Sequence, residues 1–257
     1  MFFRTLLAEY DYSLCEMLAN ERKIAELIAS TSINTVNDVI SLLRALDGAL
    51  VDEDGLKWFN LLYISVSEGV RDRSAVVQWE NPKWLERLDV IFAKLYFAAL
   101  AHWHSDRGRM ARSWAPLLEL RDKRGIMRVQ FALAGINAHI NHDLPIALVQ
   151  TGKELRLAPK RGNREHRDFD KVNAIIDAAQ EKAKQFIATG IVGLIDEDLG
   201  RLDDRIANFS VRKARETAWS NAEILWSLTR APTLRDDFLT NLDRLIALAS
   251  RGLLVPA

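Results

Sequence analysis

Apolar residues recur at intervals of three and four along most of the chain, which is the spacing of helices that bury one face. Residues 34–50, NTVNDVISLLRALDGAL, keep this spacing from Val36 to Leu46, and Gly48 follows as a helix stop. Residues 81–103 open with Asn81, a helix-capping residue, and with Pro82, which is favoured at a first helical position. Strand-like alternation is nearly absent. The pattern predicts one all-α domain over residues 1–257, an irregular bundle of roughly eight to ten helices.

Proline and glycine indicate where this helical pattern is interrupted. The segment RSWAPLLELR predicts a short helix broken or started near Pro116, and the run from Met127 to Leu157 is interrupted at Pro145. Residues 157–173, LAPKRGNREHRDFDKVN, are basic and carry Pro159 and Gly162, so we expect a long surface connection that includes His166. The remaining helices are interrupted at Gly200 and Pro232.

Charge and cysteine content exclude several classes of protein. The 257 residues include 35 Lys and Arg and 35 Asp and Glu, so no net field favours nucleic acid or an anionic membrane. The single cysteine, Cys15, rules out an intramolecular disulfide and suits a reducing compartment. Glu9 and Asp11 interrupt the apolar N-terminus, which therefore lacks the uncharged core of a signal peptide. We expect a cytoplasmic protein with no membrane span.

The stretch LAGINAHINHDL, residues 133–144, places polar side chains in an apolar helical run. His139 and Asp143 are four residues apart and share a helix face, which His142 reaches in part. Imidazole and carboxylate at this spacing can bind a divalent metal together, or Asp143 can simply orient His139 in an ion pair. Because the surrounding residues are apolar nearly all round, we expect this helix to be buried and its polar groups to need partners.

Asp89, in the apolar segment WLERLDVIFAKLYF, is the strongest candidate to complete such a site. A carboxylate in these surroundings needs a metal, an arginine or His139 itself as its partner. Arg215 or Arg212 could instead neutralise Asp89 or Asp143. Weaker candidates are Asp168, Asp170, Glu216 and Glu223, and the pair His102 and His104 is typical of a solvated helix end. Capping of the following helix would explain either Asp168 or Asp170.

Five stretches together resemble domain-of-unknown-function family 5995, a mainly bacterial family. They are EDGLKWFNLLYISVSEGV, LERLDVIFAKLYFAAL, LAGINAHINHDLPIAL, DFDKVNAII and ARETAWSNAEIL, and they span about residues 35 to 230. The resemblance implies an all-helical domain and carries no established activity. It marks a set of mainly polar and aromatic positions on apolar helices, which fits a shared internal site: Asp54, Gly55, Trp58, Phe59, Tyr63, Asp89, Phe92, Tyr96, Asn137, His139, Asn141, Asp143, Asp168, Asn173, Arg215 and Trp219.

Two hypotheses about function follow from these residues. In the first, the protein is an enzyme with an internal polar pocket, and Asp89, His139 and Asp143 are catalytic. These three would bind a divalent metal for a hydrolase or lyase reaction, or His139 would act as a general base without metal. A small-molecule ligand would contact Asn137, Asn141, Tyr96, Arg215 and Trp219. In the second, the protein is a non-enzymatic binding protein or scaffold, and Arg215 pairs with Asp89 or Asp143 in a buried structural network.

Overall fold

The structure is a computed structural model, and it describes residues 20–74, 76–189 and 210–256. Cys15, the expected lack of a signal peptide and the interruption at Gly200 lie outside these residues. Helices predominate in the described part of the chain, which contains no strand. The predicted all-α multi-helix bundle is therefore confirmed. No helix in the described ranges has the length and apolar character needed to cross a bilayer.

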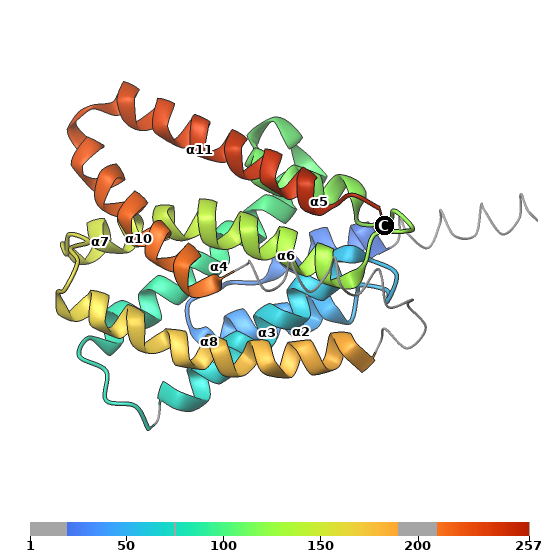
Figure 1. Cartoon of the computed structure of the whole chain (residues 1–257), viewed down its shortest axis with the longest axis horizontal. Coiled ribbons are helices and arrows are strands. Elements are labelled where there is room, and N and C mark those ends of the chain that lie inside the picture. Colours follow the sequence, from blue (N-terminus) through green and yellow to red (C-terminus); the bar gives the residue numbers. More distant parts are fainter. Residues whose placement is uncertain (1–19, 75, 190–209, 257) are drawn as a thin grey trace, which may run out of the picture.

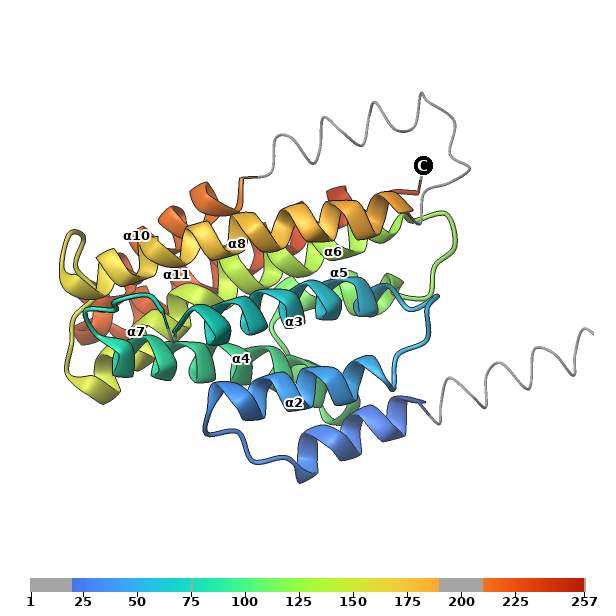
Figure 2. The same ribbon diagram turned by 90° about the horizontal axis from the view of Figure 1, so that it is seen from below.

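The chain forms one bundle of helices that lie in successive layers. A helix over residues 20–30 is followed by α2 (Val36–Asp47), α3 (Gly55–Ser74), α4 (Pro82–Ser105), α5 (Ala115–Leu120), α6 (Arg128–Ala138), α7 (Leu144–Leu155), α8 (Arg164–Thr189), α10 (Val211–Ser227) and α11 (Pro232–Leu253). In Figure 1, α11 runs across one side of the molecule beyond α6, and α8 runs along the opposite side. Figure 2 shows α2 and the helix of residues 20–30 as an outer layer below α3 and α4, with α8 and α10 on the far side.

Local sequence determines where several of these helices begin. Thr35 caps α2 by accepting a hydrogen bond from the Asp38 backbone N–H, and Asp38 accepts in return from the Thr35 N–H at 2.9 Å. Asn81 caps α4 ahead of Pro82, as predicted. The expected short helix near Pro116 is α5, which follows a 3-10 turn over Arg112–Trp114. The residue at which each helix begins helps to determine which of its side chains face the core.

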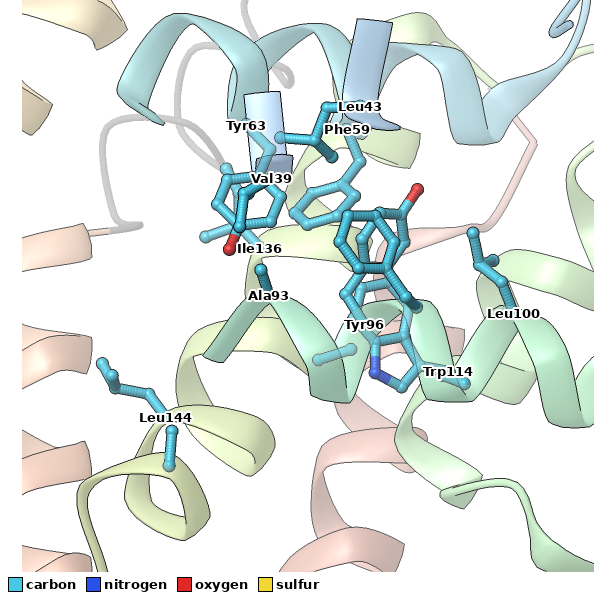
Figure 3. Close-up of a cluster of buried hydrophobic side chains, with 14 of the residues drawn as sticks. Val39, Leu43, Phe59, Tyr63, Ala93, Tyr96, Leu100, Trp114, Ile136 and Leu144 are labelled. Carbon is cyan, nitrogen blue, oxygen red and sulfur yellow. The ribbon is translucent and has the colours of Figure 1, made fainter. Parts of the chain in front are cut away.

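The core lies where α3, α4 and α6 meet. Aromatic side chains dominate it, and Figure 3 shows Phe59 and Tyr63 of α3 facing Tyr96 of α4 and Trp114 of the 3-10 turn. Trp114 and Tyr96 have no exposed surface. Full burial of such large side chains contributes most of the hydrophobic stabilisation.

Of two sequence-based expectations about local structure, the first is confirmed and the second is wrong. The run from Met127 to Leu157 is interrupted beside Pro145, where a π-helical turn over His139–Asp143 separates α6 from α7. The expected surface connection over residues 157–173 ends early, since α8 already begins at Arg164. His166 therefore lies in the first turns of a helix rather than in a loop, and only 6% of it is exposed.

Candidate functional site

An apolar cavity of about 100 Å³ lies in the middle of the bundle, between α3, α4, α6, α8 and α10. Most of its lining is aliphatic or aromatic, and its polar members are Tyr63, Asp89, His139 and Arg215. The full lining is Phe59, Leu62, Tyr63, Val66, Val70, Leu85, Leu88, Asp89, Phe92, Ile136, His139, Ile140, Leu144, Phe169, Val172, Ile176, Val211 and Arg215. An apolar cavity with a few polar groups is the usual form of a small-molecule site.

The π-helical turn brings His139 to this cavity. Pro145 has no N–H to donate to the Asn141 carbonyl, and its ring would crowd that carbonyl in an unbroken α-helix. In the observed turn, the Leu144 N–H donates to the His139 carbonyl, five residues back rather than four. This longer hydrogen-bonded loop widens the turn. The widening places His139 and His142 around the carboxylate of Asp143. Such turns are frequent at functional sites.

Asp143 is the centre of a buried polar network. Its Oδ2 accepts a hydrogen bond from Trp114 Nε1 at 3.0 Å and lies 3.0 Å from His139 Nδ1. Its Oδ1 lies 2.8 Å from His142 Nδ1. The other ring nitrogen of His142 is 3.5 Å from Asp243 Oδ1. Both oxygens of this carboxylate thus have partners, and only 2% of Asp143 is exposed.

The two histidines differ in charge because their surroundings differ. Burial lowers the pKa of His139 below its usual value, although Asp143 opposes the effect. Burial also tends to lower the pKa of His142, but Asp143 and Asp243 outweigh burial and raise this pKa. Burial alone would raise the pKa of Asp143, yet the hydrogen bonds from both rings lower it. The raised pKa therefore favours the charged form of His142 beside Asp143, whereas the lowered pKa keeps His139 neutral near pH 7.

A neutral His139 has one donor and one acceptor nitrogen. An ionised carboxylate only accepts hydrogen bonds, so the proton of His139 is on Nδ1, facing Asp143. Its Nε2 therefore carries a lone pair, and this atom is buried without a hydrogen-bond partner in the described part of the chain. A histidine oriented by a carboxylate in this way is a common general base.

Aromatic rings hold the imidazole in place. Phe92 stacks on His139 with ring centres 3.6 Å apart and planes 6° apart. Tyr63 meets the ring edge-on at 4.8 Å, and Phe59 does so at 5.6 Å. Close packing on several sides leaves the ring little freedom to turn. The base is therefore rigidly positioned.

Asp89 lines the same cavity from α4, three residues before Phe92. Its side chain is half-buried, and its Oδ2 is enclosed without a partner among the described residues. Burial, with a smaller effect from Glu86, raises the pKa of Asp89 to about 7. The hydroxyl of Tyr63 is also buried and unpartnered, and burial raises the pKa of Tyr63 well above its usual value. Three polar atoms that could each bind a ligand or a water molecule therefore belong to residues that line one cavity.

Arg215 lines the cavity but does not pair with either aspartate. Its Nε donates to Asn173 Oδ1 at 2.8 Å, its Nη2 donates to the Phe169 carbonyl at 2.6 Å, and its guanidinium lies 3.9 Å from the Phe169 ring centre. Burial lowers the pKa of Arg215 to about 10. The expected neutralisation of Asp89 or Asp143 by Arg215 is therefore wrong. Arg212 pairs with Asp177 instead, at 2.8 Å.

The other predicted ligand-binding residues lie outside the cavity lining. The Asn137 side-chain amide donates to Ile246 O and Ser250 Oγ of α11, and the Asn141 amide donates to Asn137 Oδ1 at 2.8 Å. Tyr96 packs at 5.1 Å from both Phe59 and Trp114, and Trp219 is buried against Phe169. These four side chains support the helices that carry the cavity.

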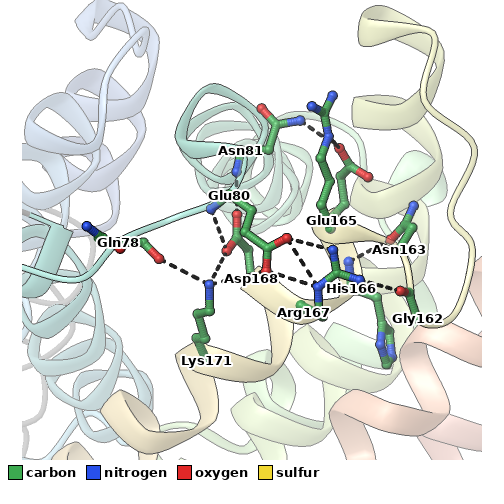
Figure 4. A network of polar contacts seen from close by, with 11 residues as sticks. Gln78, Glu80, Asn81, Gly162, Asn163, Glu165, His166, Arg167, Asp168 and Lys171 are labelled. Carbon is green, nitrogen blue, oxygen red and sulfur yellow. Dashed lines mark hydrogen bonds and ion pairs between the residues drawn. The ribbon is translucent and has the colours of Figure 1, made fainter.

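Asp168 serves a structural role that differs from the predicted cap. It lies inside α8 and accepts hydrogen bonds from the backbone N–H groups of Glu80 and Asn81, at 2.9 and 2.6 Å. Figure 4 shows Asp168 between these groups and Lys171. It therefore caps the start of α4 from a helix distant in sequence, and none of its surface is exposed.

The positions of the donor atoms show which described residues could bind one metal ion together. Among the described residues, one set of three places its donor atoms within 4.8 Å of one another: His166, Asp170 and Glu216. Asp89, His139 and Asp143 do not form such a set, and both Asp143 oxygens already have hydrogen-bond partners. Their joint binding of a metal stays a prediction. The spacing of His166 and Asp170 on one helix face was the signal for the other set, and the expected loop concealed it.

The family of the chain follows from comparison with known protein families. A family model described as "Family of unknown function (DUF5995)" matches residues 36–256. The chain belongs to this family. The match runs through α11, beyond the limit near residue 230 expected from the resemblance. No curated protein and no solved structure matches the chain.

Proposed function

We propose that this DUF5995 protein is an acid–base enzyme for a small, mainly apolar molecule, with His139 as the base. The observation that supports the proposal best is the state of His139. Its Nδ1 is held by Asp143, its ring stacks on Phe92 and its Nε2 is buried without a partner, while the residue itself lines an apolar cavity. Such a base takes a proton from a substrate or from a water molecule.

The size and polarity of the cavity define the substrate class. An apolar cavity of about 150 Å³ binds benzene, so a cavity of about 100 Å³ fits a smaller apolar group. Neutral His139 Nε2 and ionised Asp89 both accept hydrogen bonds, so the molecule should carry a hydroxyl or another donor group. We infer a short-chain substrate with one such polar end.

Asp89 and Tyr63 would supply the other half of the chemistry. With its pKa near 7, Asp89 exists in both protonation states around neutral pH and can return a proton. Tyr63 stays protonated and can donate a hydrogen bond to an oxygen that gains negative charge. Proton removal by His139 and proton return by Asp89 fit hydrolysis or elimination.

Binding of two small molecules of similar size tests this proposal. 1-Butanol has a hydroxyl donor, whereas 1-chlorobutane has none, and NMR titration measures the affinity of each. We expect the wild-type protein to prefer the alcohol by about three- to tenfold, the value of one net hydrogen bond. His139→Gln and Asp89→Asn should reduce the preference. Val66→Phe, which fills the cavity, should abolish binding of both molecules.

His104→Gln is the matched control, because His104 lies at the end of α4 and pairs with Glu21, away from the cavity. It should bind both molecules like the wild type. Equal affinity for the alcohol and the chloride, unchanged by His139→Gln, would overturn the proposed role of His139. Failure of both molecules to bind would overturn the small-molecule site itself.

A second function, as a scaffold, is supported by the partners of Asp143. This carboxylate joins Trp114 of the 3-10 turn to the π-helical turn, and His142 extends the connection to Asp243 of α11. In this alternative the network fixes the packing of three elements. Stability would then fall in Asp143 variants while the cavity bound no ligand.

A further inference from the structure

His166, Asp170 and Glu216 form a second polar cluster, on the outer side of the α8–α10 contact. His166 and Asp170 are one helical turn apart on α8, and Glu216 faces them from α10. His166 Nδ1 lies 3.5 Å from Asp170 Oδ2, and His166 Nε2 lies 3.9 Å from Glu216 Oε1. None of the three lines the central cavity. The cluster is therefore separate from the site of His139.

The imidazole of His166 distinguishes this cluster from an ordinary acidic surface. Only 8% of its side chain is exposed, and its Nε2 is enclosed without a hydrogen-bond partner in the described ranges. The Trp219 ring holds it edge-on with centres 4.7 Å apart, so the ring is fixed between the two carboxylates. Asp170 Oδ1 is also buried, and the Asp170 carboxyl group lies against that of Glu216. The buried imidazole nitrogen is thus a donor atom without a hydrogen-bond partner beside two adjacent carboxyl groups.

Two arginines lie near the cluster, and neither occupies its centre. Arg161 binds the other oxygen of Glu216, Oε2, at 2.7 Å and is half-exposed, which leaves Oε1 on the side of His166. Arg215 is held by Asn173 and by the Phe169 carbonyl. Arg161 therefore orients Glu216 from outside, as residues next to metal ligands commonly do.

We propose that His166, Asp170 and Glu216 bind a divalent cation of the Zn²⁺ type and so connect α8 to α10. One imidazole nitrogen and two carboxylate oxygens are a donor set used for Zn²⁺, and three protein ligands leave a coordination position open. The donor atoms already lie within 4.8 Å of one another, so binding requires small side-chain movements only.

Calorimetric titration of the full chain with Zn²⁺ tests the proposed site. The wild-type protein should bind one ion at this cluster, and Asp170→Asn and Glu216→Gln should each weaken binding at least about tenfold, since each removes one ligand. Glu223→Gln is the matched control. Glu223 is on the same helix and binds the backbone N–H of Arg161, but it lies outside the cluster. Its affinity for Zn²⁺ should equal that of the wild type.

A second variant and a second measurement distinguish Zn²⁺ binding at this cluster from binding by other side chains. His102→Gln/His104→Gln removes the histidine pair at the end of α4 and should keep the same affinity. In metal-free protein, Asp170→Asn should melt no lower than the wild type, because it relieves repulsion between two carboxylates, yet it should lose the rise in melting temperature caused by Zn²⁺. Equal Zn²⁺ affinity of the wild type, Asp170→Asn and Glu216→Gln would overturn the proposal.

Discussion

At the scale of single residues, two histidines that contact one carboxylate have pKa values shifted in opposite directions. His142 lies between Asp143 and Asp243, which together outweigh burial and raise its pKa, so its charged form is favoured. His139 contacts the same carboxylate but is enclosed by Phe59, Tyr63 and Phe92, and burial lowers its pKa. Burial and the second carboxylate, Asp243, thus make the difference between the two imidazoles.

Asp143→Asn should destabilise the protein most at mildly acidic pH. The stabilisation from the lowered pKa of Asp143 is present above its ordinary value of 3.8. The stabilisation from the raised pKa of His142 is present below 6.5 and is lost as the pH rises through the folded-state value. The variant should lose about 2–4 kcal/mol of unfolding free energy at pH 6 and less at pH 9.

Urea unfolding of the wild type and the variant at these two pH values measures the difference. Arg71→Gln is a suitable control, because Arg71 makes an exposed ion pair with its neighbour Asp72 and should change stability little. An Asp143→Asn penalty that is equal at pH 6 and pH 9 would contradict the proposed charge of His142.

The residues of the candidate site could be predicted from sequence only in part. The sequence singles out Asp89 and His139 as polar residues within apolar helices, and Arg215 as a possible partner for a carboxylate; the structure places all three at one cavity. The same argument selected Asn137, yet its amide faces α11. Apolar surroundings predict that a side chain is buried, but the partner it meets depends on how distant helices pack. Tyr63 could not be separated from other core aromatics for the same reason.

At the scale of helices, close contact between α3 and α6 positions both Phe59 and His139. Gly135 on α6 lies directly against the Phe59 ring, and a Cβ added there would overlap ring atoms. The helices can approach closely only because this residue has no side chain. The π-helical turn that follows could not be predicted from periodicity. The sequence shows that Pro145 interrupts the α-helix, but it does not show how the turn before Pro145 rearranges.

Gly135→Ala should therefore destabilise the protein, by about 1–3 kcal/mol, because the core cannot accommodate the extra methyl group without displacing Phe59. Gly252→Ala on α11 is the matched control, since nothing lies within 4 Å of a Cβ at that position. Alanine should there add about 0.5 kcal/mol through its higher helix propensity. Chemical denaturation measures both changes. A Gly135→Ala variant as stable as the wild type would contradict the close α3–α6 contact.

At the scale of the whole molecule, α11 completes the network around the site although it contributes nothing to the cavity lining. Asp243 accepts hydrogen bonds from the Arg112 and Ser113 backbone N–H groups and faces His142. Gln130 donates to the carbonyls of Leu253 and Val255. Several contacts that orient α11 on the bundle are thus polar, and apolar periodicity alone does not predict them.

Removal of residues 231–257 should consequently disrupt the whole bundle rather than shorten it. Truncation removes the α11 partners of Gln130, Asn137 and His142. It also exposes the apolar core surface that Phe238, Leu239 and Leu253 cover. Together these losses approach the entire stability of an ordinary domain. We expect the truncated chain to lose its near-ultraviolet circular dichroism and its cooperative unfolding in urea. In the full chain, Leu245→Glu is the control, because 65% of Leu245 is exposed and the change should leave both signals intact. A truncated chain that unfolds cooperatively at the wild-type urea concentration would show that the network around His142 does not depend on α11.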